Sequence, residues 1–416
     1  MTMDLKSSAA ESSSSRRHFF GLSDAMTQTD DDGHDAMEMG SVLPIPVDAL
    51  AIASPVSKVE VVPPQSPPLT KDIILSDEQE NKKELPWLLD YVSYLLHLAV
   101  FGILGVLTRY GLQYLFGPGI IGLTSDQSVL YLALAPNMVG SFLMGWLGIV
   151  FKGDISRVSN HLAVGLTTGY LGSLTTFSGW NQQMLDLSVE GKWSFVFGIP
   201  LGFILADYSI IYGVRTAKAF KEFLETSNGL PLCKPSSFKS NGKVDNFKSQ
   251  FTVVFLLLLA LGSAWGAGGA FVKRGFSHGG SGVQLWLGCI VGPFGVWIRW
   301  FLACQLNGRG FGKSGWLKWL PFGTLIANVS AASLMAALAA LQKAVRTETC
   351  DAIATGIQFG LLGCLSTVST FVAEIHLLRE SNKPWRGDAY AIVTIVLSFG
   401  LGTLIYSVPV WTRGYD

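Results

Sequence analysis

Two asparagines lie inside long apolar stretches of the sequence, where an amide has no water to bond with. Asn137 lies in APNMVGSFLMG (135–145), and Asn328 lies in IANVSAASLMA (326–336). Because an unpaired buried amide is costly, each side chain must find a partner. Each amide offers two N–H donors, which would suit an anion stripped of its water, whereas hydrogen bonding between helices is the alternative. Both residues are therefore candidate anion ligands.

Glycines and hydroxyl residues interrupt two other apolar stretches. These are GYLGSLTTFSGW (169–180) and GLLGCLSTVSTF (360–371). Such a composition lets a membrane helix unwind, and unwound carbonyls are tolerated at membrane depth when they are buried in protein or coordinate an ion. Close packing of small residues between helices is the alternative. Because the interruption occurs twice at equivalent positions, we expect a broken helix in each stretch.

Four ionisable side chains within apolar stretches are weaker candidates. Arg109 and Arg299 lie near predicted helix ends, where a long side chain can either reach toward the membrane surface or attract an anion. Asp207 and Glu374 are functional candidates because a carboxylate inside a membrane is expensive. For both carboxylates, pairing with a neighbouring arginine or exposure at the interface is the favoured interpretation.

The elements that must position these groups are long apolar helices. Only 14% of the 416 residues are charged, against roughly a quarter in an ordinary soluble protein. A membrane-spanning helix needs about 20 mostly apolar residues. The sequence contains nine such stretches, and so predicts an all-α membrane protein with nine transmembrane helices: 92–115, 128–151, 159–181, 193–214, 251–272, 282–306, 316–341, 352–377 and 388–410.

Charge distribution predicts the topology of these helices. Residues 1–85 hold 15 acidic and 7 basic residues among many Ser and Pro, a composition typical of a disordered tail. With this tail in the cytoplasm, the inner flanks of the helices carry 16 Lys and Arg, seven of them in a basic loop at 215–250, and the outer flanks carry 6. Since positive residues favour the cytoplasmic side, we expect a cytoplasmic N-terminus and an extracellular C-terminus.

The candidate residues recur at a nearly constant offset. Asn137 and Asn328 are 191 residues apart, as are the two interrupted stretches, and Arg109 and Arg299 are 190 apart. The chain thus divides into a four-helix repeat (86–214), a linking helix (251–272) and a second four-helix repeat (273–416). Because the linking helix crosses the bilayer once, the second repeat must insert upside down. Inverted repeats place their functional sites at the interface between the repeats.

Other chemistries find no support in the sequence. No catalytic triad, nucleotide-binding loop or metal-binding cluster argues for an enzyme, and the five cysteines show no paired spacing. No basic surface interleaved with aromatic residues argues for nucleic-acid binding.

Three motifs resemble those of the Fluc (CrcB) and FEX fluoride channels. They are Gly105-x-x-x-Arg109, Asn137-x-x-Gly140-Ser-Phe142 and Gly172-Ser-Leu-Thr-Thr-Phe177-Ser. The four-plus-one-plus-four layout is similar to the fused eukaryotic, plant-like FEX form, and the resemblance covers about residues 92–410. It implies a plasma-membrane channel through which cytosolic fluoride leaves passively, conferring fluoride resistance. It also implies a monomer whose two repeats act as an internal pseudo-dimer.

The resemblance implies roles for particular residues. Asn137 and Asn328 would line the pores, with hydroxyl donors at Ser178 and Ser369, while Arg109 and Arg299 would attract the anion. A structural sodium ion would be held by the main-chain carbonyls at the two helix breaks. These carbonyls belong to Gly172, Thr175, Gly363 and Ser366.

The two pores implied by the resemblance are unequal. The family has two pore phenylalanines three residues apart, and the corresponding pairs here are Phe177 with Trp180 and Val368 with Phe371. Each family pore is thought to combine the first aromatic of one unit with the second of the other. One pore would therefore hold Phe177 and Phe371, and the other would hold Val368 and Trp180 and be impaired.

Two other functions remain alternatives at this stage. The first is an ion-coupled secondary transporter of a small anion, built on the same inverted repeat, with Asp207 or Glu374 as its coupling carboxylate. The second is a membrane scaffold that uses the acidic tail as an interaction arm.

Overall fold

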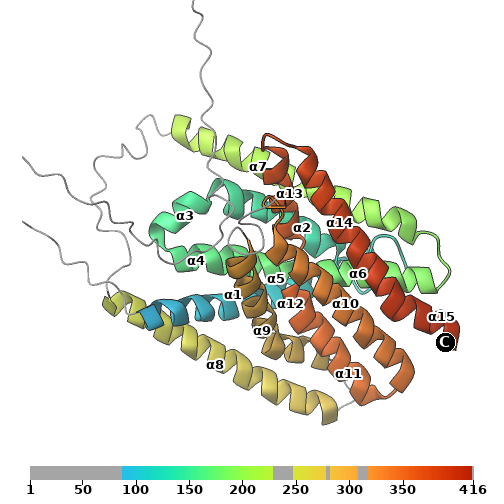
Figure 1. The fold of residues 1–416 in the computed structure, drawn as a ribbon. Helices are drawn as coiled ribbons and strands as arrows, with labels where there is room; N and C mark the ends of the chain where they lie inside the picture. The colour runs from blue at the N-terminus through green and yellow to red at the C-terminus, as the bar shows by residue number, and fades with distance from the viewer. Residues whose placement is uncertain (1–86, 228–246, 278–281, 308–316, 415–416) are drawn as a thin grey trace, which may run out of the picture. The chain divides into compact units, whose positions relative to one another are not determined.

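The computed structural model describes residues 87–227, 247–277, 282–307 and 317–414, and every regular element in these ranges is a helix (Figure 1). The predicted all-α class is thereby confirmed. The predicted tail, residues 1–85, and residues 228–246 of the predicted basic loop lie outside the described residues.

The N-terminal half contains a bent helix followed by a broken one. The broken helix consists of four short pieces that follow one another from residue 160 to residue 189. The elements of this half, in chain order, are α1 (Trp87–Phe116), α2 (Leu134–Leu143), the π-helical η2 (Met144–Val150), α3 (Lys152–Val158), α4 (Asn160–Val164), the π-helical η3 (Gly165–Leu171), α5 (Gly172–Leu174), α6 (Phe177–Val189) and α7 (Phe195–Ser227).

The C-terminal half follows the same order after one additional helix, α8 (Phe247–Ser277). Its broken helix runs from residue 348 to residue 379. The elements of this half are α9 (Val283–Leu306), α10 (Phe322–Val345), α11 (Glu348–Ile357), the π-helical η4 (Gln358–Leu362), α12 (Gly363–Leu365), α13 (Ser369–Arg379), α14 (Trp385–Gly402), the π-helical η5 (Thr403–Ser407) and α15 (Val408–Arg413).

The described helices make this a multi-pass membrane protein. Seven of them are long and apolar enough to cross a membrane, and the pair Leu134–Val150 and Lys152–Val158, bent by 65°, could form an eighth span. The predicted number of nine is therefore not confirmed. The stretch 160–189, in which the longest piece, α6, has 13 residues, is not among these spans.

The broken helices lie at the centre of the helix assembly and α8 lies at its edge. Helices α1 and α9 pack against each other, and each packs against the π-helical segment of its own half, η3 or η4. In the most apolar part of Glu348–Arg379, 72% of the residues are buried, whereas in α8 only 17% are. Helix α8 contacts α1 and α9 and lies along one edge of the helix bundle in Figure 1.

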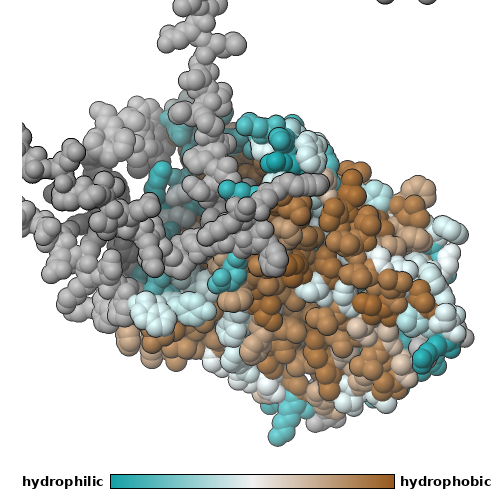
Figure 2. Space-filling model, viewed as in Figure 1, coloured by the Kyte–Doolittle hydropathy of each residue, from teal (hydrophilic) through white to brown (hydrophobic). Residues whose placement is uncertain are grey.

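Apolar side chains cover much of the outer surface. Figure 2 shows broad hydrophobic areas over the helices in view. On α8 the exposed side chains include Phe251, Phe255, Leu256 and Leu259. A soluble protein rarely exposes a continuous apolar area of this extent, so these side chains suit contact with lipid.

Candidate ion-conduction site at the two helix breaks

Each broken helix contains a short extended segment in the protein core. In the first half, Thr175 (φ −95°, ψ 151°) and Thr176 (φ −141°, ψ 120°) separate α5 from α6. In the second half, Ser366 (φ −87°, ψ 157°) follows α12. The side chain of Thr176 accepts a hydrogen bond from the Gly179 N–H at 3.2 Å and so caps the new helix. The predicted breaks are therefore present in both stretches.

The two candidate asparagines hold these breaks open. The Thr176 N–H donates to Oδ1 of Asn137 at 2.8 Å, and Nδ2 of Asn137 donates to the Thr176 carbonyl at 3.1 Å. Asn328 makes the same two bonds with Thr367 at the same two distances. Each amide thus replaces the helical hydrogen bonds that the break removes, and both amides are fully buried.

The asparagines differ in their remaining donor capacity. Nδ2 of Asn137 also donates to the hydroxyl of Tyr131 at 3.2 Å, so both of its hydrogens have acceptors. Residue 322, which corresponds to Tyr131 at an offset of 191, is a phenylalanine and has no hydroxyl. Asn328 therefore resembles Asn137 in its role at the break but lacks the equivalent second acceptor.

Hydroxyl side chains lock the two breaks together. Oγ of Ser369 lies 3.0 Å from Oγ1 of Thr175, and Oγ of Ser178 lies 2.8 Å from Oγ of Ser366. The backbone N–H groups of Ser369 and Ser178 also donate to those same oxygens, at 3.1 and 3.0 Å. The predicted residues Ser178 and Ser369 therefore lie at the interface between the two halves, each bonded to the opposite break.

The four carbonyls proposed for a sodium ion have lost their helical donors. In an α-helix the carbonyl of residue i accepts from the N–H of residue i+4. The donor for Gly172 would be the Thr176 N–H, which bonds Asn137 instead, and the donor for Gly363 would be the Thr367 N–H, which bonds Asn328. The donors for Thr175 and Ser366 are likewise diverted, to the hydroxyls of Thr176 and Thr367. Buried carbonyl oxygens that have lost their helical donors are suitable ligands for a hard cation.

Both candidate arginines are buried and cross to the opposite half. Arg109 is 1% exposed and its Nη2 donates to the Phe359 carbonyl at 2.7 Å. Arg299 is 3% exposed, and its Nη2 donates to the Thr168 carbonyl at 2.9 Å. Phe359 and Thr168 lie in the π-helical segments η4 and η3. The expectation that these side chains lie near helix ends and could reach the membrane surface is wrong, because both guanidinium groups are buried and donate hydrogen bonds to carbonyls inside the protein.

Where each guanidinium meets the opposite broken helix, a glycine leaves the space that the guanidinium occupies. A Cβ atom on Gly363 would lie 2.2 Å from Nη1 of Arg109, and a Cβ on Gly172 would lie 2.2 Å from Nη1 of Arg299. We expect Gly363→Ala to lower the free energy of unfolding by about 2–4 kcal/mol, because the guanidinium must leave its carbonyl acceptor. Thermal unfolding of the purified protein measures this loss. Gly400→Ala is the control, since nothing lies within 4 Å of its Cβ position; equal melting temperatures for the two variants would contradict the prediction.

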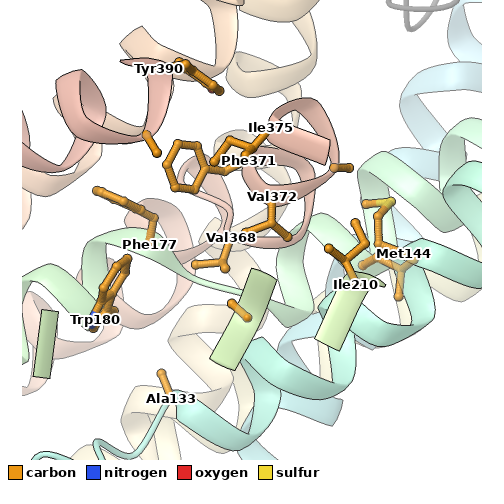
Figure 3. Packing of buried hydrophobic residues seen from close by; sticks show 14 of the residues in the cluster. Ala133, Met144, Phe177, Trp180, Ile210, Val368, Phe371, Val372, Ile375 and Tyr390 are labelled. Atoms are coloured by element: carbon orange, nitrogen blue, oxygen red, sulfur yellow. The ribbon is translucent and has the colours of Figure 1, made fainter. Parts of the chain in front are cut away.

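One buried cluster contains Phe177, Trp180, Phe371 and Tyr390 (Figure 3). The rings of Phe177 and Phe371 meet edge to face with centroids 5.6 Å apart, so the structure brings the predicted pair together. The ring centroids of Trp180 and Phe177 are 5.4 Å apart. Val368 belongs to the same cluster but has no ring. The two-pore scheme alone would place Trp180 apart from Phe177 and Phe371. In the structure, Trp180 instead contacts Phe177.

The two candidate carboxylates have different surroundings. Asp207 forms an ion pair with Arg379 at 2.7 Å, as expected. Glu374 is 2% exposed and accepts hydrogen bonds from Oγ1 of Thr324 at 2.7 Å and the hydroxyl of Tyr390 at 2.8 Å. The expectation of an arginine partner or an exposed position for Glu374 is wrong, because neutral hydroxyl donors solvate this carboxylate inside the protein.

A row of buried hydroxyls on α14 escaped the sequence analysis. Tyr390, Thr394 and Ser398 occur at intervals of four and are 0% exposed, and the Tyr390 ring contacts Phe371 at 5.2 Å. The residues at the corresponding positions of α7 are Ile199, Phe203 and Asp207. The spacing of four within an apolar helix was the signal that could have revealed this row.

A multi-pass helical protein whose two halves interlock at broken helices in the core belongs to a class typical of ion channels and secondary transporters. The chain belongs to the CrcB family: the family model described as CrcB-like protein, Camphor Resistance (CrcB), matches residues 96–214 and again residues 286–406. The double match confirms the internal repeat.

Relatives in bacteria and fungi carry descriptive names. The chain is 33% identical over 115 residues to the fluoride-specific ion channel FluC 2 of Listeria monocytogenes, which covers 28% of this chain and 79% of that protein. It is 25% identical to fluoride export protein 1 of Candida albicans, over 78% of this chain and 82% of that protein. It is also 25% identical to fluoride export protein 1 of Saccharomyces cerevisiae, over 78% and 95%. No solved structure matches the chain.

Proposed function

We propose that this protein is a fluoride export channel through which fluoride leaves the cytosol passively. The family membership, the channel and export relatives, and the interlocked breaks support this function. These relatives are named as channel and export proteins, so we propose transport and no enzymatic reaction. The observation that carries the proposal is the aromatic pair Phe177 and Phe371, which lies beside the two breaks in a buried position.

The chemistry of this pair suits a small dehydrated anion. Fluoride holds its water tightly, so a narrow pore must replace that water with other positive groups. The edge of an aromatic ring is positive, and an edge-to-face pair leaves ring edges available to an ion. Amide and hydroxyl donors, such as Asn328, Ser178 and Ser369, would supply the rest.

We propose that one of two pores is intact. It would use Phe177 and Phe371, with the hydroxyl row of α14 along the same route. The second route would use Val368 and Trp180 and would follow α7, where the position equivalent to Ser398 is Asp207, paired with Arg379. A missing ring edge and a carboxylate on the route both oppose passage of an anion.

The function is tested by measuring fluoride efflux from liposomes that contain the full-length protein, with chloride as the control anion. We expect fluoride efflux that follows the membrane potential and does not respond to a proton gradient. The rival function, an ion-coupled anion transporter, is favoured by the buried carboxylate of Glu374. Strict coupling of efflux to a proton gradient would establish the rival, and absence of any fluoride efflux would refute both.

We also propose that a sodium ion binds between the two halves and stabilises their interface. It would be held by the carbonyls of Gly172, Thr175, Gly363 and Ser366, whose usual helical donors are bonded elsewhere. Replacing sodium with a large organic cation should then lower the melting temperature of the purified protein, because an ion that binds only the folded state stabilises it by about 2.7 kcal/mol at a hundred times its dissociation constant. A melting temperature that is independent of sodium would contradict this proposal.

The orientation in the membrane completes the proposal. We propose a monomer in the plasma membrane, with a cytoplasmic N-terminus, an extracellular C-terminus and repeats of opposite orientation that form an internal pseudo-dimer. The excess of positive residues on the inner flanks supports this orientation. Labelling of single cysteines introduced at the two ends of the chain with an impermeant reagent tests it, and labelling of both ends from the same side would refute it.

A further inference from the structure

A polar hollow of about 610 Å³ lies where the two halves meet. The C-terminal part of α6, from Gln182 to Glu190, forms one wall, and the C-terminal part of α10 and the first part of the second broken helix form another. In the proposed orientation these parts lie on the extracellular side. Since a water molecule occupies about 30 Å³ in the liquid, an ion that reaches this hollow has room to regain its water.

The row of hydroxyls on α14 leads to this hollow. From Ser398 the interval of four continues through Gly402 to Tyr406. Tyr406 is 3% exposed and lines the hollow. Its hydroxyl forms a hydrogen bond with the carboxylate of Asp186, which also lines the hollow. The hollow therefore lies at the outer end of the route that we propose to be intact.

Three glutamines in the wall of the hollow direct their amide nitrogens toward the protein. Nε2 of Gln182 donates to Oδ1 of Asp186 at 2.9 Å, and Nε2 of Gln183 donates to the main-chain carbonyl of Asp126. Nε2 of Gln358 likewise donates to a main-chain carbonyl. Because these oxygens can only accept, the orientation of each amide is fixed. The bonded N–H groups are not available to an anion in the hollow.

Carboxylates outnumber cations among the residues that line the hollow. The carboxylates are those of Asp126, Asp186, Glu190 and Asp351, and the cations are Lys343 and Arg346. Glu190 forms an ion pair with Lys192 at 2.7 Å, which leaves three carboxylates against two cations. A fluoride ion in the hollow therefore meets a net negative charge.

The repeat fold does not require this charge. At an offset of 191, the counterpart of Asp186 is Leu377 and that of Asp351 is Asn160. Both carboxylates thus occur in one repeat only, although the asparagines and the breaks occur in both.

We propose that the hollow is an electrostatic exit that releases fluoride to the outside and hinders its return. An ion that leaves the hydroxyl row meets the charge of Asp186 where it must regain its water, so it is held weakly, as conduction requires. The same charge lowers the fluoride concentration at the outer mouth. Asp207 replaces a hydroxyl within the row of the second route, whereas Asp186 lies in a wide hollow where water weakens the repulsion.

This inference rests on the proposed channel function and orientation, and fluoride fluxes in sealed right-side-out membrane vesicles from cells that express the protein test it. These vesicles give all channels one orientation. At low ionic strength, efflux should exceed influx when the fluoride gradient and the membrane potential are equal and opposite.

Asp186→Asn keeps the shape of the side chain and removes its charge. The ratio of efflux to influx should fall by about threefold, which is the effect in water of one unit charge about 6 Å from the ion. Glu225→Gln removes an exposed carboxylate of α7 that does not line the hollow, and should leave the ratio unchanged.

The outcomes separate the exit from the channel function. A wild-type protein without fluoride flux would overturn both. Fluoride flux with the same ratio in the wild type and in Asp186→Asn would overturn the exit alone, as would a wild-type ratio that favours influx.

A second measurement needs no variant. Raising the ionic strength to about 1 M with ions that do not permeate shortens the range of electrostatic interactions in water to about 3 Å. The wild-type ratio should then fall toward that of Asp186→Asn at low ionic strength. A ratio that is independent of ionic strength would overturn the exit.

Discussion

Replacing Phe371 with isoleucine should lower fluoride efflux from liposomes by about a hundredfold. The side chain stays apolar and close in volume, so the buried cluster remains filled. The variant nevertheless loses the ring that meets Phe177 at 5.6 Å and Tyr390 at 5.2 Å. A dehydrated ion that loses one of its few positive contacts faces a barrier higher by about 3 kcal/mol, which corresponds to that loss of rate. Efflux measured with a fluoride electrode provides the test.

Val368 offers the matched control for this prediction. It lies in the same buried cluster and is 2% exposed, but it has no ring edge to present to an ion. Val368→Ala should therefore destabilise the protein somewhat and leave efflux largely intact. Equal losses of efflux in Phe371→Ile and Val368→Ala would mean that the aromatic pair is not the conducting element.

The repeat offset explains why the positions of the two helix breaks could be predicted. Once Asn137 and Asn328 were matched, the same offset of 191 placed the two interrupted stretches and their carbonyls in equivalent positions. The structure pairs Asn137 with Thr176 and Asn328 with Thr367 at identical distances. The repeat made this prediction possible, because each break and its asparagine occur twice in the sequence at the same offset.

Features that depend on contacts between the two halves could not be predicted from the sequence. The position of Arg109 in an apolar stretch does not indicate that its acceptor is the carbonyl of Phe359, 250 residues away. The predicted number of nine spans is also not confirmed, since seven described helices, or eight with the bent pair, are long and apolar enough.

The second large effect concerns Asn328, which clamps the break of the second half by bonding the N–H and the carbonyl of Thr367. Asn328→Leu should abolish most fluoride efflux and lower the free energy of unfolding by about 2–4 kcal/mol. The substitution removes both hydrogen bonds between Asn328 and Thr367, and a buried group that stays unpaired costs about 1–3 kcal/mol. Efflux and thermal unfolding of the same purified variant measure both losses. Ser330→Ala on the same helix is the control, because its hydroxyl bonds only the local carbonyl of Ala327.

The clamp also predicts how Asn328→Leu would fail. Without Asn328, the Thr367 N–H is free to bond the carbonyl of Gly363, which is the ordinary helical partner four residues earlier. The break would then close, and the carbonyl that we assign to sodium would be occupied. The variant should consequently lose the stabilisation by sodium as well as the efflux. Retention of the sodium effect in Asn328→Leu would show that the asparagine is not what holds the break open, and that Thr175, Ser366 and the paired serines suffice.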